Sequence, residues 1–284
     1  MARPIRIEFP GAIYHVTTRG NEGDDIFVDD EGRTQFLTVL GEVVARVGWI
    51  VHAYVLMDNH YHLLIETPKA NLSRGMRQLN GVYTQRFNSL HGSGGRVFQG
   101  RFKAILTEPD GVLPELCRYI VLNPVRLKAV KNVARYRWSS YRATAGEVKA
   151  PSWLSSEASL AEFGRNLNVA QRKYVEFVEA GVNLPSPLSK VKAQVLLGSA
   201  AFIKKMKQQL VSKTNLKRAK SVPMRPNLKS LFPLKVREDK SLRNVAIKLA
   251  YKQYAYTMAA IAEAAQIHFS TVSKVIQTGE HKAA

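Results

Sequence analysis

Two histidines, His60 and His62, lie two residues apart in a segment from Ile50 to Glu66 that the sequence predicts to be one or two strands. Alternate side chains of a strand point to the same face, so both imidazoles are expected to face one point while Tyr61 faces the other way. Neutral imidazole is the commonest protein ligand of metals, and an ion held by two histidines and one oxygen ligand keeps positions open for a phosphate. Two packed histidines on a strand would show the same pattern, so the pair alone does not establish a metal site.

A second group of reactive side chains, Tyr119 and Asn123, lies at the end of a predicted helix from Gly111 to Leu122. Residues four apart share one helix face, so a phenol and an amide oxygen could approach the same ion. Tyrosine, whose ordinary pKa is about 10, can attack phosphorus when nearby positive charge stabilises the developing negative charge. The alternative interpretation is ordinary helix packing, with Asn123 and Pro124 as a helix stop. Tyr83, in an earlier predicted helix, is the rival nucleophile.

The elements that must position these residues alternate between strands and helices. Strand patterns cover residues 12–19, 50–66 and 96–108, and helical patterns cover residues 30–47, 72–90 and 111–122. This order predicts an α+β fold in which a small sheet is covered on one side. The sequence contains neither a GxGxxG nor a GxxxxGKS/T motif, so it offers no support for a dinucleotide or P-loop site.

The composition favours a polyanionic partner. The 284 residues include 42 Lys and Arg against 22 Asp and Glu, a net charge of +20, which favours DNA or RNA. The single cysteine, Cys117, excludes an intramolecular disulfide and every multi-cysteine zinc module. Without an apolar run of membrane-spanning length or a signal peptide, the expected location is the bacterial cytoplasm, at the nucleoid, with no membrane partner.

The second half of the chain has a different character. Residues 182–237 contain no Asp or Glu, and Pro-rich stretches flank a short helix expected near residues 193–211. Residues 241–254 are predicted to be helical, and residues 256–277 fit a helix-turn-helix in which Ser270 caps the second helix, although an ordinary αα-hairpin would fit too. We therefore expect domains at residues 1–150 and 226–284, joined by a basic helical linker region at residues 151–225.

Several basic side chains are candidate DNA contacts because of where they lie. Arg19 ends the first strand, and three others flank Phe98 and Phe102 in a predicted strand, where rings could stack on bases; core packing is the alternative role for the two rings. The remaining candidates lie in the acid-free segment or in the second helix of the C-terminal pair. The full set is Arg19, Arg96, Arg101, Lys103, Lys204, Lys205, Lys217, Arg218 and Lys274.

Taken together and in order, these motifs resemble a known family. His60-Tyr61-His62 resembles the HUH motif (His, bulky hydrophobic, His), and residues 119–125 resemble the tyrosine helix of small bacterial transposases that act on single-stranded DNA, with REP-associated tyrosine transposases the most similar. Residues 10–21, 83–88, 97–103 and 138–141 also match, so the resemblance covers about residues 5 to 145.

This resemblance implies a ferredoxin-like antiparallel sheet with helices on one face, followed here by the basic helical region. It implies that Tyr119 cleaves single-stranded DNA near a hairpin and becomes joined to the 5′ phosphate. It further implies that His60 and His62 hold Mg²⁺ or Mn²⁺, with Asn123 as the candidate third ligand. The expected partner is single-stranded or hairpin DNA, and the protein is expected to be a homodimer or a monomer. A DNA-binding regulator without catalysis and an RNA-binding module are the alternatives, but neither explains why His60, His62 and Tyr119 occur together.

Overall fold

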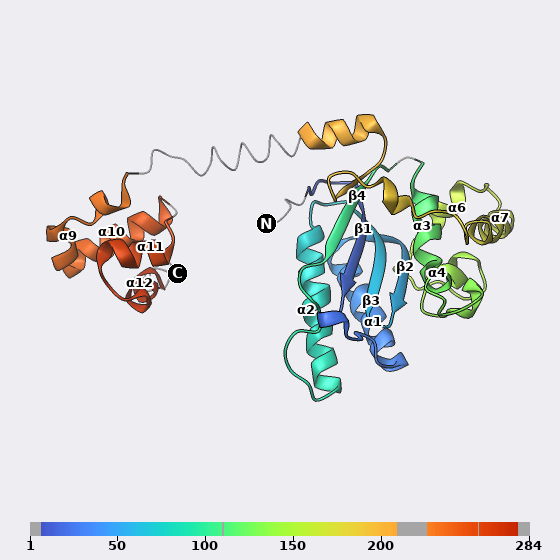
Figure 1. Cartoon of the computed structure of the whole chain (residues 1–284), viewed down its shortest axis with the longest axis horizontal. Coiled ribbons are helices and arrows are strands. Elements are labelled where there is room, and N and C mark those ends of the chain that lie inside the picture. Colours follow the sequence, from blue (N-terminus) through green and yellow to red (C-terminus); the bar gives the residue numbers. More distant parts are fainter. Residues whose placement is uncertain (1–6, 110, 209–225, 255, 278–284) are drawn as a thin grey trace. The chain divides into compact units, whose positions relative to one another are not determined.

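The computed structural model describes residues 7–109, 111–208, 226–254 and 256–277. The chain divides into two compact units, Met1–Lys207 and Gln208–Ala284, and each is described by itself (Figure 1). Within the described residues, no helix combines the length and the apolar character needed to cross a membrane.

The first unit contains a five-stranded sheet with the order β2-β3-β1-β4-β5. The strands are β1 (Ala12–Arg19), β2 (Ile50–Met57), β3 (His60–Thr67), β4 (Lys103–Thr107) and β5 (Leu196–Leu197). The pairs among β1 to β4 are antiparallel, whereas β5 pairs with β4 in parallel. With α1 (Asp30–Val47) after β1 and α2 (Leu72–Leu90) after β3, the first four strands have the βαββαβ order and the strand arrangement of a ferredoxin-like fold. The predicted α+β class is therefore confirmed.

Local signals fix the elements around the histidine pair. Asp29 caps α1 by accepting a hydrogen bond from the Gly32 amide, and Gly48 ends the helix in the left-handed region at φ 72°. Strands β2 and β3 are separated by two residues, Asp58 and Asn59, a length typical of tight hairpins. His60 is consequently the first residue of β3.

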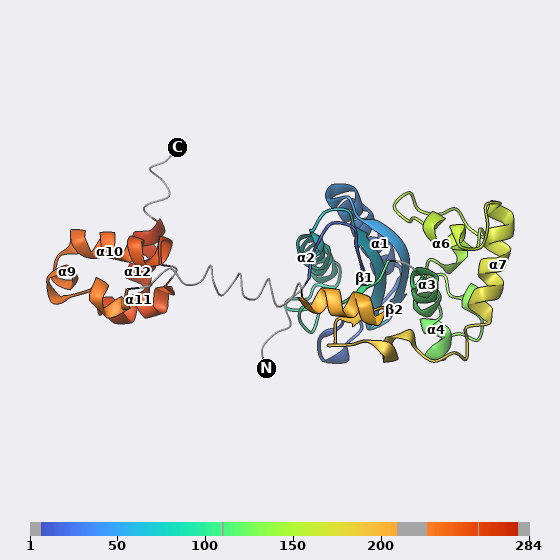
Figure 2. The same ribbon diagram turned by 90° about the horizontal axis from the view of Figure 1, so that it is seen from above.

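Helices cover both faces of the sheet. On one face, Phe36 of α1 packs against both Tyr61 of β3 and Tyr83 of α2. On the other face, α3 (Leu113–Val121) packs through Cys117 and Ile120, so the sheet lies between α2 and α3 (Figure 2). The expectation of helices on one face describes α1 and α2 but not α3, because the second face of the central strands is also largely apolar and needs a cover.

The region after α2 differs from the predicted elements at two places. The strand predicted over residues 96–108 is limited to β4, and residue 98 makes only an isolated bridge with residue 20. The predicted helix ends as α3 at Val121, but Asn123 and Pro124 open a further turn, α4 (Asn123–Arg126). Pro124 lies in the first turn of α4, where the missing amide proton costs no hydrogen bond.

Residues 151–207, expected to belong to a linker region, pack within the first unit. Tyr174 and Val178 of α7 (Leu167–Glu179) form an apolar cluster with Val121 and Tyr141. Residues 200–208 are helical and follow β5, so the helix expected near residues 193–211 begins later than predicted. The short elements of this unit are η1 (Asn21–Gly23), η2 (Val133–Arg135), α5 (Tyr141–Thr144), α6 (Glu157–Ala161), α7 (Leu167–Glu179) and η3 (Pro187–Lys190).

The second unit has its own apolar core, which includes Phe232, Ile247, Ile261 and Val272. Its elements are η4 (Leu228–Leu231), α9 (Leu234–Glu238), α10 (Lys240–Lys252), α11 (Met258–Ala265) and α12 (Phe269–Gln277). Helices α11 and α12 are joined by a short turn in which Gln266 has φ 55°. Ser270 is not the cap of α12. It lies inside the helix, and the Ser270 amide donates to Nδ1 of His268 (3.3 Å) just before the helix begins.

Candidate functional site

The two histidines face the same side of the sheet, as strand alternation requires. His60 and His62 lie opposite Arg19 and Thr17 of β1, and their ring centroids are 5.1 Å apart. His62 is buried and His60 is half-buried. The pair therefore sits at the junction of two central strands, immediately after the hairpin turn.

One ring nitrogen of each histidine already has a partner. Nδ1 of His60 lies 2.7 Å from Oδ1 of Asn59, and Nδ1 of His62 lies 2.9 Å from Nε2 of His15. An amide oxygen only accepts, so His60 carries its proton on Nδ1 and leaves Nε2 as a free lone pair. No hydrogen bond within the described residues uses Nε2 of either His60 or His62. Metal-binding histidines commonly have this arrangement, with the second ring nitrogen held by a protein group.

The surroundings keep these imidazoles neutral. Burial lowers the pKa of His60, the charge of Arg19 lowers it further, and Asp58 opposes the shift. Burial also lowers the pKa of His62 well below its usual value, with added repulsion from His15 and His60. Since a metal binds only the unprotonated nitrogen, both rings are suited to coordination at neutral pH.

His15 is a member of this site that the sequence reasoning missed. It is 1% exposed, its ring is nearly parallel to that of His62 at 6°, and burial lowers its pKa to about 4. Its Nδ1 is buried without a hydrogen-bond partner in the described part of the chain. The available signal was strand alternation in β1, but only the register with β3 shows that His15 reaches His62.

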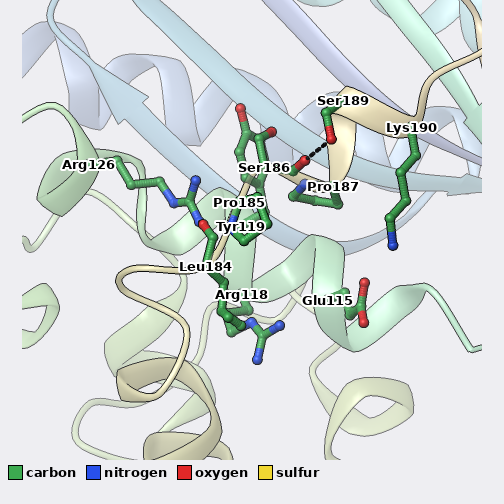
Figure 3. A pocket seen from close by; sticks show the side chains of 10 residues that line it. All are labelled: Glu115, Arg118, Tyr119, Arg126, Leu184, Pro185, Ser186, Pro187, Ser189 and Lys190. Atoms are coloured by element: carbon green, nitrogen blue, oxygen red, sulfur yellow. Dashed lines mark hydrogen bonds between the residues drawn. The ribbon is translucent and has the colours of Figure 1, made fainter.

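Tyr119 reaches the histidines from α3, the helix on this face of the sheet. Its ring stands edge-on to His15 at 5.9 Å and to His62 at 6.3 Å between centroids. The side chain is half-buried, and the guanidinium carbon of Arg126 lies 5.3 Å from its ring centroid. Tyr119 also lines a cavity on its other side, where Arg118, Arg126 and Lys190 are found (Figure 3).

The rival tyrosine is part of the core on the opposite face. Tyr83 is fully buried, donates a hydrogen bond to the carbonyl oxygen of Ile26 (2.5 Å), and packs against Phe36 and Phe98. Burial raises the pKa of the Tyr83 phenol far above its usual value. The sheet thus separates Tyr83 from the histidine pair, and Phe98 has a packing role.

Asn123 is not shown to join the site. Its amide nitrogen donates to the carbonyl oxygens of Tyr119 (3.0 Å) and Ile120 (3.2 Å), which stabilises the end of α3. None of the interactions recorded for the described residues links Asn123 to a histidine. The described residues also include no group of three or more His, Cys, Asp or Glu side chains placed to hold a metal.

These observations fit a divalent cation bound by two imidazoles and completed by oxygen ligands. The two rings are neutral, face one side and keep Nε2 free. The other ligands would have to be a water, a phosphate or the Asn123 oxygen, which are hard ligands of the kind that Mg²⁺ and Mn²⁺ accept.

Three of the basic candidates, Arg19, Arg101 and Lys103, lie beside this centre. Arg19 neighbours His60, and Lys103 lies opposite Thr17, the residue that pairs with His62. Arg101 and Lys103 line a cavity of about 730 Å³ together with His15 and His62. The other described candidates, Arg96, Lys204, Lys205 and Lys274, are exposed. Lys217 and Arg218 lie outside the described residues.

Comparisons with known proteins extend over the same region. Residues 9–123 match the sequence model of the family described as IS200-like transposases. No curated protein matches the chain.

Two solved structures are similar to part of this chain. A REP-associated tyrosine transposase bound to a REP hairpin is 18% identical and matches with a TM-score of 0.46 over 55% of this chain and 92% of its own. A Deinococcus radiodurans R1 protein assigned as a transposase is 19% identical and matches with a TM-score of 0.31 over 42% of this chain and 95% of its own. It is the family match over residues 9–123 that confirms the resemblance seen in the motifs: the region carrying His60, His62 and Tyr119 is similar to IS200-like transposases.

Proposed function

We propose that the protein is a metal-dependent single-strand DNA endonuclease and strand transferase that cuts near hairpin DNA through a covalent bond to Tyr119. The observation that carries this proposal is the edge-on approach of Tyr119 to His62 and His15. A tyrosine from a separate helix thereby reaches the histidine cluster. The sequence resemblance assigns the role of nucleophile to Tyr119 and the roles of metal ligands to His60 and His62.

The chemical step is a transfer of one phosphate linkage. The Tyr119 hydroxyl gives its proton to water and its oxygen forms a bond to the phosphorus, while the bond from phosphorus to the 3′ oxygen breaks and that oxygen takes up a proton from water. The 5′ phosphate stays on the tyrosine, and reversal of the step with another 3′ hydroxyl rejoins the strand without ATP. Arg126, close to the phenol ring, would favour the negative charge that develops on the oxygen.

His60 and His62 would hold the divalent cation, with Asn123 proposed as a further ligand. Bound Mg²⁺ or Mn²⁺ supplies positive charge that polarises the scissile phosphate. The hydrogen bond that His60 donates to Asn59 and the hydrogen bond between His62 and His15 fix the orientation of the two rings before any metal arrives.

The second unit would bind the duplex part of the hairpin. Its α11 and α12 are joined as in a helix-turn-helix, and exposed Lys274 lies on the second helix. The arrangement of this unit, with a core of its own, supports a separate binding role.

The test is incubation of the protein with a labelled oligonucleotide that carries a hairpin and a single-stranded flank, with Mn²⁺ or Mg²⁺. A denaturing gel should show a protein-DNA adduct that disappears with a chelator and in Tyr119→Phe. Binding without an adduct, across many sequences and both metals, would instead indicate a DNA-binding regulator.

A further inference from the structure

The cavity beside Tyr119 is built from two parts of the chain that are distant in sequence. Its volume is about 170 Å³. One wall comes from α3 and α4, and the other from residues 184–190, which contain η3 (Figure 3). The second wall, like Arg126, lies outside residues 9–123 and therefore outside the region matched by the transposase family.

The second wall is held in place by specific contacts. Arg126 donates from Nη2 to the carbonyl oxygen of Leu184 (2.6 Å). The Ser186 side chain caps η3 by accepting from the Leu188 amide (3.2 Å). Leu188 and Val191 pack against the apolar cluster that includes Ile120 of α3. The segment consequently forms a fixed side of the cavity.

Positive charge dominates the lining of the cavity. Arg118, Arg126 and Lys190 contribute three positive charges, and Glu115 contributes one negative charge. No ion pair in the described part of the chain involves any of these four side chains. Nε of Arg126 is buried without a hydrogen-bond acceptor among those residues, a condition that costs free energy unless a ligand provides the acceptor.

The electrostatics of Arg118 agree with this description. Burial lowers the pKa of Arg118, Glu115 opposes the shift, and the like charge of Arg126 lowers it further. An anion in the cavity would offset the burial cost and the repulsion at the same time. Arg118 itself stacks on Phe177, with 4.0 Å from its guanidinium carbon to the ring centroid, and donates from Nη1 to the Phe177 carbonyl oxygen (3.4 Å). By contrast, Nε of Arg126 and the ammonium group of Lys190 make no hydrogen bond within the described residues.

We propose that this cavity binds a backbone phosphate of single-stranded DNA, next to the phosphate that Tyr119 attacks, and that Arg126 and Lys190 are its ligands. This inference rests on the proposed function, because it takes Tyr119 as the nucleophile. It assigns to residues 184–190 a part in substrate binding that the matched region alone cannot supply.

The test removes one negative charge at a time from the DNA and one positive charge at a time from the protein. A series of single-stranded oligonucleotides, each with one neutral methylphosphonate linkage, is bound to the full chain, and affinity is measured by fluorescence anisotropy. The wild-type protein should lose affinity at a linkage beside the cleaved one. In Lys190→Ala the sensitivity at that linkage should shrink, and the slope of log K against log salt should fall by about 0.7, the value for one contact with a single strand.

Lys173→Ala is the matched control, because Lys173 is exposed on α7 and does not line the cavity. Lys173→Ala should keep the wild-type linkage profile, that is, the dependence of affinity on which phosphate linkage is neutral. Lys190 is itself exposed, so Lys190→Ala should leave the thermal unfolding temperature unchanged. Arg126→Lys tests the second ligand while keeping its positive charge.

Adduct formation, measured in parallel, separates this inference from the proposed function. A linkage profile that depends on Lys190 supports the phosphate site even if no adduct forms. An adduct at Tyr119 together with identical linkage profiles and salt slopes for Lys190→Ala and wild type would overturn the phosphate site and leave the nuclease proposal standing.

Discussion

The two faces of the same sheet carry different kinds of side chains. Tyr61 points to the face of α1 and α2, where its hydroxyl donates to Asn80 and its ring packs on Phe36. One residue away on either side, His60 and His62 point to the face of α3. Each face also receives a tyrosine from a helix, Tyr83 on one side and Tyr119 on the other.

The difference between these tyrosines lies in their surroundings. Tyr83 is enclosed by aromatic rings and its hydroxyl is already used by a backbone carbonyl, so it stabilises the core. Tyr119 is half-buried, contacts imidazoles and lies under a guanidinium. A reactive role for a tyrosine therefore depends on which face of the sheet its helix covers. The residue type alone does not indicate that face.

Removing the hydroxyl group of each tyrosine in turn should give the largest difference between the two faces. Tyr119→Phe is expected to abolish the covalent adduct, because among the described tyrosines it is the Tyr119 ring that packs against His62. Tyr83→Phe should keep the adduct and lower the free energy of unfolding by about 1 kcal/mol through loss of one hydrogen bond. The measurements are the denaturing gel and urea unfolding. An adduct that persists in Tyr119→Phe but not in Tyr83→Phe would reverse the assignment of the two faces.

Removal of one imidazole should have the next largest effect. His62→Ala is expected to lower the rate of adduct formation more than 100-fold and to weaken Mn²⁺ binding in a calorimetric titration, because one of two protein nitrogen ligands is lost. His52→Ala is a useful comparison, since His52 is a buried histidine whose ring pairs with Glu66. If His52→Ala and His62→Ala lowered Mn²⁺ affinity equally, the metal would not belong to the α3 face.

The hydrogen bond between His15 and His62 should contribute less to metal binding than a direct ligand does. His15→Leu is expected to weaken Mn²⁺ binding about 10-fold to 100-fold, the usual range for groups that orient a ligand. His15→Gln, which can still accept a hydrogen bond from Nδ1 of His62, should restore part of this loss. Equal Mn²⁺ affinity for all three proteins would show that His15 only fills space.

Acid should destabilise the first unit by protonating His15. The pKa of His15 is lowered from 6.5 to about 4 by burial, so the unfolded chain binds the proton more readily than the folded chain between these values. The stabilising contribution is therefore complete above about pH 6.5 and is lost as pH falls toward 4, by roughly 3 kcal/mol in total. Urea unfolding of wild type and His15→Gln at pH 7 and pH 5 checks this. The difference in stability between the two pH values should be smaller in the variant, and an identical difference would contradict it.

The smallest expected effect on the chemistry comes from the second unit. A fragment that lacks residues 208–284 should keep the first unit intact and form the adduct at high protein concentration. It should bind hairpin DNA more weakly, with a flatter dependence on salt, because phosphate contacts are lost. Hairpin affinity equal to that of the full chain would remove the basis for a duplex-binding role.

Part of this picture could be predicted from the sequence. The boundaries of β1, α1 and α2 agree with the predicted ranges because their apolar spacing is a local signal, and α1 also has a cap at Asp29. The shared orientation of His60 and His62 follows from strand alternation. The proximity of Tyr119 came from the resemblance, because spacing within one helix says nothing about which strand it covers.

Other parts depend on contacts that local patterns do not encode. The role of His15 requires the register of β1 against β3. The position of residues 184–190 beside Tyr119 depends on pairing between segments about 60 residues apart, such as Arg126 with Leu184. Ser270 was predicted as a cap because it is a good capping residue type, whereas His268 occupies that position.

The two-residue strand β5 has a consequence for how the protein can be shortened. The amides of Leu106 and Glu108 donate to the carbonyl oxygens of Val195 and Leu197 (2.8 and 2.9 Å), so β5 shields one border of the sheet. A polypeptide that stopped at residue 150 would leave these donors open to solvent and to neighbouring molecules, a known route to aggregation. The smallest piece expected to remain monodisperse thus extends beyond residue 197, well past the part that the family shares.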